Sequence, residues 1–170
     1  WLQGLAFYVD EHCIVPRSLI AELLVDGGID YWLTPSTHRV LDLCTGNGSL
    51  AVIAATVFPE VEVTASDLSL EALAVARINV DKHGLQERIT LLESDALGAP
   101  TLQARGPFDL ILCNPPYVNA QSMADLPREY QAEPVLALAG GTDGMDFVRT
   151  LFTQAPGHMA PGSVMVLEIG

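Results

Sequence analysis

Basic residues are scarce in this sequence. Only 8 of its 170 residues are Lys or Arg, against 21 Asp and Glu, which gives a formal net charge of −13. Charged residues together make up 17% of the chain, below the roughly 25% of an average globular domain. Because the few basic residues form no cluster, we expect no direct binding of nucleic acid through phosphate contacts.

Long apolar runs and paired cysteines are absent too. Hydrophobic residues reach 49%, yet Asp, Gly and Pro interrupt the apolar runs well before the ~20 residues of a membrane helix. Cys13, Cys44 and Cys113 form no CxxC pair, and this odd count without metal-ligand spacing predicts reduced thiols in a cytoplasmic protein. The four histidines show no ligand spacing either, so we expect neither a metal site nor a membrane contact.

The length of the chain fits one domain with a sizeable core. Its two ends suggest that it is a fragment of a longer protein. The sequence begins with Trp1 rather than Met, and Val164 to Ile169 has the pattern of a buried strand with no segment after it to cover its edge.

Alternating strand and helix patterns predict an α/β fold. Short segments rich in Val, Ile and Leu and bounded by turn residues predict five strands, at residues 39–43, 61–66, 89–94, 108–113 and 163–169. Helical patterns lie between most of them, including 49–55, a helix from an N-cap at Ser69 to His83, and one that starts near Asp143. We therefore expect βαβ units in a mostly parallel sheet with helices on both faces.

The first residues have a different pattern. Leu5 to Val9 and Cys13 to Val15 are apolar segments separated by Asp10-Glu11-His12, which predicts a β-hairpin. Pro16-Arg17-Ser18 then opens an amphipathic helix. We accordingly divide the chain into a hairpin with its connecting segment, residues 1–17, and an α/β domain, residues 18–170.

A glycine-rich turn follows the first predicted strand. Cys44-Thr45-Gly46-Asn47-Gly48 spans the end of that strand and the start of a helix, and 46–51 satisfies G-x-G-x-x-[GA]. Glycines let the backbone approach a ligand closely, and a helix N-terminus offers free N–H groups. Taken alone, a tight turn without a ligand explains the pattern about as well.

Two carboxylates end the next two strands. Asp67 lies 19 residues beyond Gly48, where a carboxylate can accept both hydroxyls of an adenosine ribose; its alternative role is a helix cap, which Ser69 serves at least as well. Asp95 ends the third strand, and its two interpretations, a contact to the adenine edge and a solvated loop carboxylate, stay equally open.

The most specific motif is Asn114-Pro115-Pro116-Tyr117, directly after the fourth strand. Two prolines fix the backbone and remove two N–H donors, so carbonyls remain free as acceptors beside a carboxamide and an aromatic ring. A rigid turn with a packed Tyr is the alternative. The irregular segment 114–142 follows, and a loop of this length in a compact domain is typical of a lid or a binding loop.

With these motifs the chain resembles those class I S-adenosylmethionine-dependent methyltransferases whose fourth strand ends in this tetrapeptide. The stretches Phe7 to Asp10, Val15 to Arg17, Glu133-Pro134 and Ala139 to Gly144 are similar to those of the protein-glutamine N-methyltransferases. Within that group, Pro16-Arg17-Ser18 and Met123 to Tyr130 resemble the branch that modifies a protein of the large ribosomal subunit. The resemblance covers essentially the whole chain.

The resemblance implies a role for each motif. It implies a Rossmann-like methyltransferase sheet that binds S-adenosylmethionine through Cys44, Thr45, Gly46, Asn47, Gly48, Asp67, Asp95 and Asn114. The substrate would contact the tetrapeptide, with the Asn114 side-chain oxygen and the Pro115 carbonyl as acceptors for amide hydrogens, and with Tyr117 beside the amide and the sulfonium. Three features depart from the family. Its N-terminal helical region and its last pair of strands are absent from the chain, and Asn47 replaces a commoner Ser or Thr.

We therefore expect an enzyme that methylates a glutamine side-chain amide of a large-subunit ribosomal protein. Glutamine methylation of peptide release factors is the nearest alternative, and methylation of the exocyclic amine of adenine in nucleic acid is a further one. Outside methyl transfer, the glycine turn and Asp67 also fit an NAD-binding Rossmann module.

Overall fold

The computed structural model of the chain describes residues 1–127 and 133–169. Its centre is a five-stranded, fully parallel sheet with the strand order β3-β2-β1-β4-β5. The strands are β1 (Arg39–Leu43), β2 (Glu62–Asp67), β3 (Ile89–Glu93), β4 (Phe108–Cys113) and β5 (Met159–Leu167). This arrangement confirms the predicted α/β fold with a parallel sheet.

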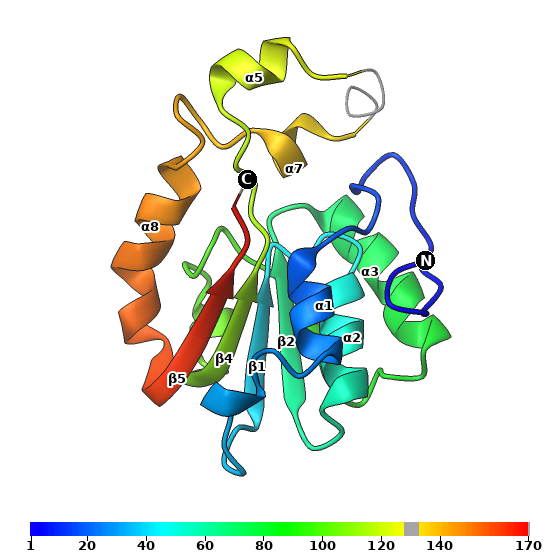
Figure 1. The fold of residues 1–170 in the computed structure, drawn as a ribbon, viewed down its shortest axis with the longest axis vertical. Coiled ribbons are helices and arrows are strands. Elements are labelled where there is room, and N and C mark those ends of the chain that lie inside the picture. The colour runs from blue at the N-terminus through cyan, green and yellow to red at the C-terminus, as the bar shows by residue number, and fades with distance from the viewer. Residues whose placement is uncertain (128–132, 170) are drawn as a thin grey trace.

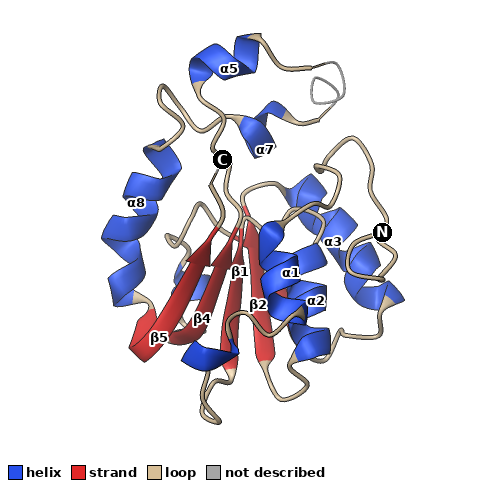
Figure 2. Cartoon of the chain, in the orientation of Figure 1, coloured by secondary structure: helices blue, strands red, loops and turns tan. Residues whose placement is uncertain are grey.

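The helices cover both faces of the sheet (Figures 1 and 2). The helices in the described residues are α1 (Leu19–Val25), α2 (Ser49–Val57), α3 (Leu70–Lys82), α4 (Pro100–Gln103), α5 (Ala120–Ala124), α7 (Val135–Leu138) and α8 (Asp146–Gln154), with the short 3-10 helices η1 (Asp30–Trp32) and η2 (Ala155–Gly157), and all but α5 and α7 lie beside the sheet. None of the helices in the described ranges is long and apolar enough to span a membrane.

Alternate residues of the strands build two cores, one on each face. On one face, Val40 of β1 and Leu110 of β4 pack with side chains of α1, α2 and α3. On the other face, Leu41 of β1 and Ile111 of β4 pack with side chains of α4 and α8. Because the three inner strands β1, β2 and β4 are covered on both faces, most of their residues are buried.

Local signals placed both ends of α3 well. The Ser69 hydroxyl accepts a hydrogen bond from the Ala72 N–H at 3.1 Å, as expected of an N-cap, and Gly84 follows α3 with φ +68°. The last predicted helix, expected from near Asp143 to just before Pro161, is shorter and runs from Asp146 to Gln154, because Pro156 cannot donate to the helical ladder. β5 starts at Met159, earlier than expected. The register between β4 and β5 shifts between Phe108 and Leu110, and this shift accommodates Pro161-Gly162 within the strand.

The predicted β-hairpin in residues 1–17 is wrong. These residues contain no strand, only an isolated bridge between Leu2 and Leu5. The reason is that a side chain replaces the partner strand: the Tyr8 N–H donates to Asn79 Oδ1 at 2.7 Å, and Asn79 Nδ2 donates to the Tyr8 carbonyl at 3.0 Å. In a hairpin, the N–H and the carbonyl of Tyr8 would bond to a second strand. Here both groups bind Asn79 of helix α3 instead.

The segment between β4 and α8 lies beyond the carboxyl ends of the strands. It carries α5 and α7, which Figure 1 shows above that edge of the sheet. Of the segment from Met123 to Tyr130 that supported the resemblance, residues 128–130 lie outside the described residues.

Candidate active site

Two adjoining pockets lie at the carboxyl edge of the sheet. The inner pocket is lined by residues that follow β1, β2, β3 and β4, among them Cys44, Gly46, Asp67 and Asp95. The outer pocket lies between the start of α1, the segment after β4 and the end of β5. Asn114 lines both pockets. Groups bound in the two pockets can therefore meet beside this side chain.

The glycine loop, residues 44–48, forms one wall of the inner pocket. Cys44, Gly46 and Gly48 have positive φ angles of 60°, 54° and 79°. An added Cβ on Gly46 would meet nothing within 4 Å, whereas on Gly48 it would lie 3.1 Å from the Ala76 Cβ in α3. Gly46 therefore leaves space at the pocket wall, and Gly48 allows the loop to approach the helix closely.

Asp67, at the end of β2, is fixed by the loop beside it. Its Oδ2 accepts a hydrogen bond from the Gly46 N–H and its Oδ1 from the Ser69 N–H, both at 2.9 Å. Burial raises the pKa of this carboxyl above its ordinary value, while the two backbone donors oppose that shift. Each oxygen keeps further lone pairs, so Asp67 can accept hydroxyl groups from a ligand in the inner pocket.

Two fully buried polar residues that the sequence analysis missed hold the loop from behind. Asp42 Oδ2 accepts from the Thr45 hydroxyl at 2.5 Å and from the Ala51 N–H at 2.9 Å, and burial raises the pKa of Asp42 to about 7. Asn79 Nδ2 donates to the Asn47 carbonyl at 2.8 Å. The available signal was a carboxylate within an apolar strand and an amide on the apolar face of a helix.

The tetrapeptide separates the two pockets. Pro116 lines the inner pocket, and Pro115 and Tyr117 line the outer one. The Asn114 Nδ2 lies 3.5 Å from the Arg17 carbonyl, to which it donates. Tyr117 lines the outer pocket and not the inner one, and its expected contact with the cofactor sulfonium stays a prediction.

Two glycines hold the backbone of Tyr117 in place. An added Cβ on Gly144 would lie 2.3 Å from the Tyr117 carbonyl oxygen, and one on Gly140 would lie 2.7 Å from the Tyr117 Cα. The Val118 N–H donates to the Leu138 carbonyl, and the Gly140 N–H donates to the Val118 carbonyl, both at 2.8 Å. The segment after α7 therefore packs against the tetrapeptide so closely that no side chain fits between them.

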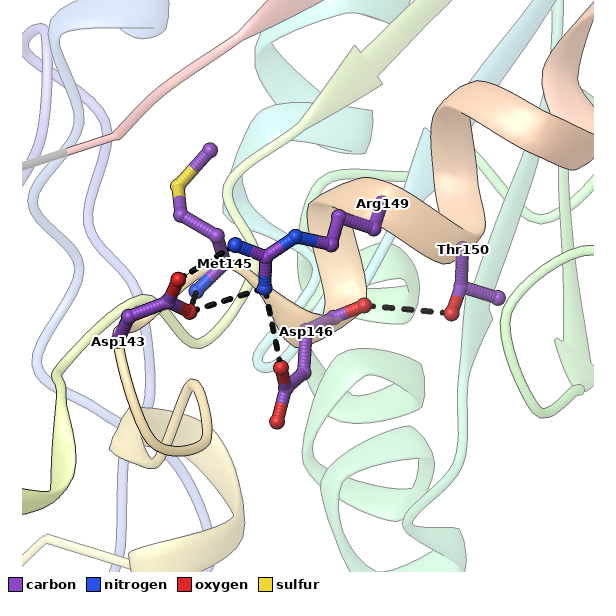
Figure 3. Close-up of polar contacts among 5 residues, drawn as sticks. All are labelled: Asp143, Met145, Asp146, Arg149 and Thr150. Atoms are coloured by element: carbon purple, nitrogen blue, oxygen red, sulfur yellow. Dashed lines mark hydrogen bonds and ion pairs between the residues drawn. The ribbon is translucent and has the colours of Figure 1, made fainter.

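Ionic contacts anchor this supporting segment to α8 (Figure 3). Arg149 donates to both carboxylate oxygens of Asp143 and, at 3.2 Å, to Asp146 Oδ1. The hydrogen bond from Arg149 lowers the pKa of Asp143 to about 2. Phe147, one residue beyond Asp146, lines the inner pocket. The start of α8 thus contributes to both the support and the wall of the site.

A second ionic contact involves Arg17, which lines the outer pocket. The Arg17 guanidinium donates to both oxygens of Glu133, at 2.8 and 2.6 Å, and the Val15 N–H donates to Glu133 Oε1 at 3.2 Å. The Glu133 side chain is only 8% exposed. This bidentate pair ties the residues before α1 to the segment before α7.

Two of the cysteine thiols have raised pKa values. Burial raises the pKa of the Cys13 thiol to about 12, and a hydrogen bond with Cys113 together with burial raises that of Cys44. These thiols therefore stay protonated and are poor nucleophiles. In the described part of the chain, Asp10, Glu11 and His12 bring three potential metal ligands within 4.8 Å of one another, on a partly exposed turn.

The structure brings most of the predicted site residues together. Cys44, Gly46, Asp67, Asp95 and Asn114 line one pocket, although the side chain of Asp95 is exposed. The other three predicted cofactor residues do not line it: they shape the loop through buried contacts and are Thr45, Asn47 and Gly48. Sequence reasoning did not find the residues that complete the wall from distant segments, including His12, Cys13, Ile14 and Phe147.

Comparison with curated proteins gives consistent relatives. The chain is 51% identical over 172 residues to a ribosomal protein uL3 glutamine methyltransferase of Bordetella pertussis (strain Tohama I), and 52% identical over 176 residues to one of Burkholderia pseudomallei (strain K96243). Each alignment covers 100% of this chain, and the shares of the relatives are 56% and 57%. The chain thus spans a little over half the length of these relatives.

Solved structures share the fold at low sequence identity. The hMettl16 catalytic domain in complex with MAT2A 3'UTR hairpin 6 aligns with a TM-score of 0.70 at 15% identity, over 90% of this chain and 57% of that one. The N-terminal domain of human METTL16 in complex with SAH aligns with a TM-score of 0.59 at 15% identity, over 90% and 56%.

One family model covers the glycine loop, Asp67 and the tetrapeptide together. The model of the methyltransferase small domain matches residues 24–132, which is more than half of the sequence. This segment runs from α1 through β4 and includes every residue that we predicted to bind the cofactor. The chain therefore belongs to the methyltransferase small domain family.

Proposed function

We propose that this chain forms the catalytic domain of an S-adenosylmethionine-dependent enzyme that methylates the side-chain amide nitrogen of a glutamine in ribosomal protein uL3. The observation that carries the proposal is the position of Asn114, which lines both the inner and the outer pocket. A methyl donor in the inner pocket and an amide in the outer pocket would meet beside an acceptor side chain.

The inner pocket fits the cofactor. Asp67 offers carboxylate oxygens for the ribose hydroxyls, Gly46 leaves room for close backbone approach, and Asp95 lies at the end that would receive the adenine. When bound, S-adenosylmethionine supplies a methyl group already activated on a sulfonium. The complex of the METTL16 domain with SAH supports this assignment through the shared fold.

The outer pocket would act on the amide through acceptors. An amide nitrogen is a poor nucleophile because its lone pair is delocalised into the carbonyl. Accepting both N–H bonds, at Asn114 Oδ1 and the Pro115 carbonyl, favours a pyramidal nitrogen whose lone pair faces the methyl group. Holding the reacting atoms about 3–3.5 Å apart can contribute ~7–11 kcal/mol to lowering the barrier. The methylated nitrogen then loses its extra proton to water, so no protein base is needed.

The names of the relatives and the charge of the chain support the substrate. Both curated relatives are called ribosomal protein uL3 glutamine methyltransferases. A net charge of −13 would also favour the approach of a basic ribosomal protein over that of nucleic acid. We place the enzyme in the cytoplasm, where ribosomal proteins are available.

The test is methyl transfer from labelled S-adenosylmethionine to three acceptors: uL3, a peptide release factor and adenine-containing nucleic acid. We expect label in a glutamine of uL3 and much less in the other two. Label mainly in the release factor would show that the substrate is a release factor and not uL3. Label in nucleic acid would show that the methyl acceptor is the exocyclic amine of adenine and not a glutamine amide. Binding of NAD in preference to S-adenosylhomocysteine would contradict the methyltransferase assignment as a whole.

Asn114→Ala separates chemistry from binding in the same assay. Because the acceptor contact should strengthen as the nitrogen becomes pyramidal, its loss should lower kcat by about 10²–10³, as for one preorganised polar group in other active sites. Cofactor affinity, measured by calorimetry, should fall much less. A near-normal rate with a collapsed cofactor affinity would make Asn114 a cofactor ligand instead.

A further inference from the structure

Asn114 belongs to a closed circuit of hydrogen bonds that joins three separate parts of the chain. The circuit starts at the end of β4, where the Cys113 carbonyl accepts from the N–H of Glu168 at 3.0 Å. The Glu168 carboxylate then receives the Ser18 hydroxyl and, at 3.0 Å, the Leu19 N–H on the same oxygen, Oε2. Glu168 thus fixes the start of α1 against the end of β4.

The circuit closes through the residue before Ser18. The Arg17 carbonyl, one residue before the anchored hydroxyl, accepts from Asn114 Nδ2 at 3.5 Å. Asn114 directly follows Cys113, where the circuit began. The position of the Arg17 carbonyl relative to Asn114 therefore depends on the Glu168 carboxylate.

This contact decides which end of the Asn114 amide faces the site. A backbone carbonyl can only accept a hydrogen bond, so the end of the amide that lies against Arg17 must be the NH₂ group. The side-chain oxygen then points away from Arg17. If the Arg17 carbonyl were free to move, the Asn114 side-chain amide could rotate. Its NH₂ group would then face the N–H groups of the substrate amide, and the two sets of donors would repel each other.

We propose that Glu168 is a positioning residue: through Ser18, Leu19 and the Arg17 carbonyl it holds the Asn114 side chain with its oxygen available to accept from the substrate nitrogen. This inference rests on the proposed function, in which Asn114 Oδ1 is such an acceptor. Glu168 acts as a hydrogen-bond acceptor here, and its negative charge is not required.

Two substitutions of Glu168 test the acceptor role. Glu168→Ala removes the acceptor and should lower kcat by about 10- to 100-fold, as with other groups that orient a directly acting ligand, while the dissociation constant of S-adenosylhomocysteine stays unchanged. Glu168→Gln keeps an oxygen that can accept from both Ser18 and Leu19, so it should restore most of the rate. Glu62→Ala, which removes an exposed carboxylate at the opposite end of the sheet, is the matched control and should behave as wild type.

A double-mutant cycle shows whether Glu168 acts through Asn114. If it does, adding Glu168→Ala to Asn114→Ala should cost almost nothing further in kcat; independent effects would multiply. Three outcomes would each overturn the inference. They are multiplying effects in the double mutant, an unchanged rate in Glu168→Ala, and a Gln variant as slow as the Ala variant.

If Glu168→Ala does not fold, Ser18→Ala replaces it: a lower kcat at unchanged cofactor affinity supports the inference, and an unchanged kcat overturns it. Failure of the wild type to methylate any glutamine would instead contradict the proposed function itself.

Discussion

Single residues of this chain take their roles from which backbone groups they bind. Asp67 and Asn114 are both polar residues at the end of a strand, yet the first is fixed by two N–H donors and the second by a carbonyl acceptor. A carboxylate fixed by donors still has lone pairs for hydroxyl groups, and an amide fixed through its NH₂ group presents its oxygen. Each contact thus leaves free the group that the site would use.

Asp67→Ala should weaken binding of S-adenosylmethionine by one to two orders of magnitude. The substitution removes charge-assisted hydrogen bonds to the ribose, worth about 1.5–3 kcal/mol each, and it releases the Gly46 N–H. Calorimetric titration with S-adenosylhomocysteine measures the loss, with Asp26→Asn, an exposed carboxylate, as the control. Unchanged affinity would mean that Asp67 serves only to hold the glycine loop and the start of α3.

At the scale of elements, contacts between neighbouring segments shape the site more than the segments themselves do. The glycine loop is formed between β1 and α2, but its distance from α3 depends on Gly48 and Ala76. The tetrapeptide follows β4, but Gly140 and Gly144 from a later segment pack against its Tyr117. Glycine is required in these places because a second piece of backbone, or the start of another side chain, occupies the space of a Cβ.

A pair of glycine variants tests this close approach. Gly84→Ala, at φ +68° with open space around it, should cost only the strain of the left-handed conformation, about 1–2 kcal/mol. Gly48→Ala, at φ +79°, should cost a further ~1–3 kcal/mol because its Cβ would be forced against Ala76. Urea denaturation of both variants and the wild type gives the difference. Equal losses would contradict a packing role for Gly48.

For the whole molecule, the buried carboxyl of Asp42 links folding to pH. Its ordinary pKa of 3.8 is raised to about 7 by burial in the folded state. Between these values the folded protein holds a proton that the unfolded chain has released, so stability should fall as the pH rises from about 4 to about 7 and then level off. The shift corresponds to at most about 4 kcal/mol.

Asp42→Asn should remove this pH dependence. We expect the variant to gain stability relative to wild type as the pH is raised from 4 to 8, because a neutral amide has no proton to release. Denaturant unfolding at several pH values measures the gap between the two curves, and Asp26→Asn should leave the shape of the curve unchanged. Parallel curves for Asp42→Asn and wild type would show that the buried carboxyl does not titrate in this range.

The architecture and the motifs of this protein could be predicted from the amino-acid sequence. Strands such as 108–113 are mostly apolar and buried, and caps such as Ser69 bind backbone groups only a few residues away. Covered strands and local caps depend on short stretches of sequence, so their patterns can be read directly. The glycine loop, Asp67 and the tetrapeptide were predictable for the same reason, because each lies at the end of a strand that the pattern identified.

How distant segments complete the site could not be predicted and became visible in the folded chain. Asn79 binds the backbone of Tyr8, 71 residues away, and a segment without strands, bound to α3, stands where the hairpin was expected. Glu168 binds Ser18 across 150 residues, and the direction of the Asn114 amide depends on that contact. Such long-range hydrogen bonds produce no periodic pattern in the sequence. A single polar residue in an apolar stretch can be recognised, but the sequence does not indicate which distant group it binds.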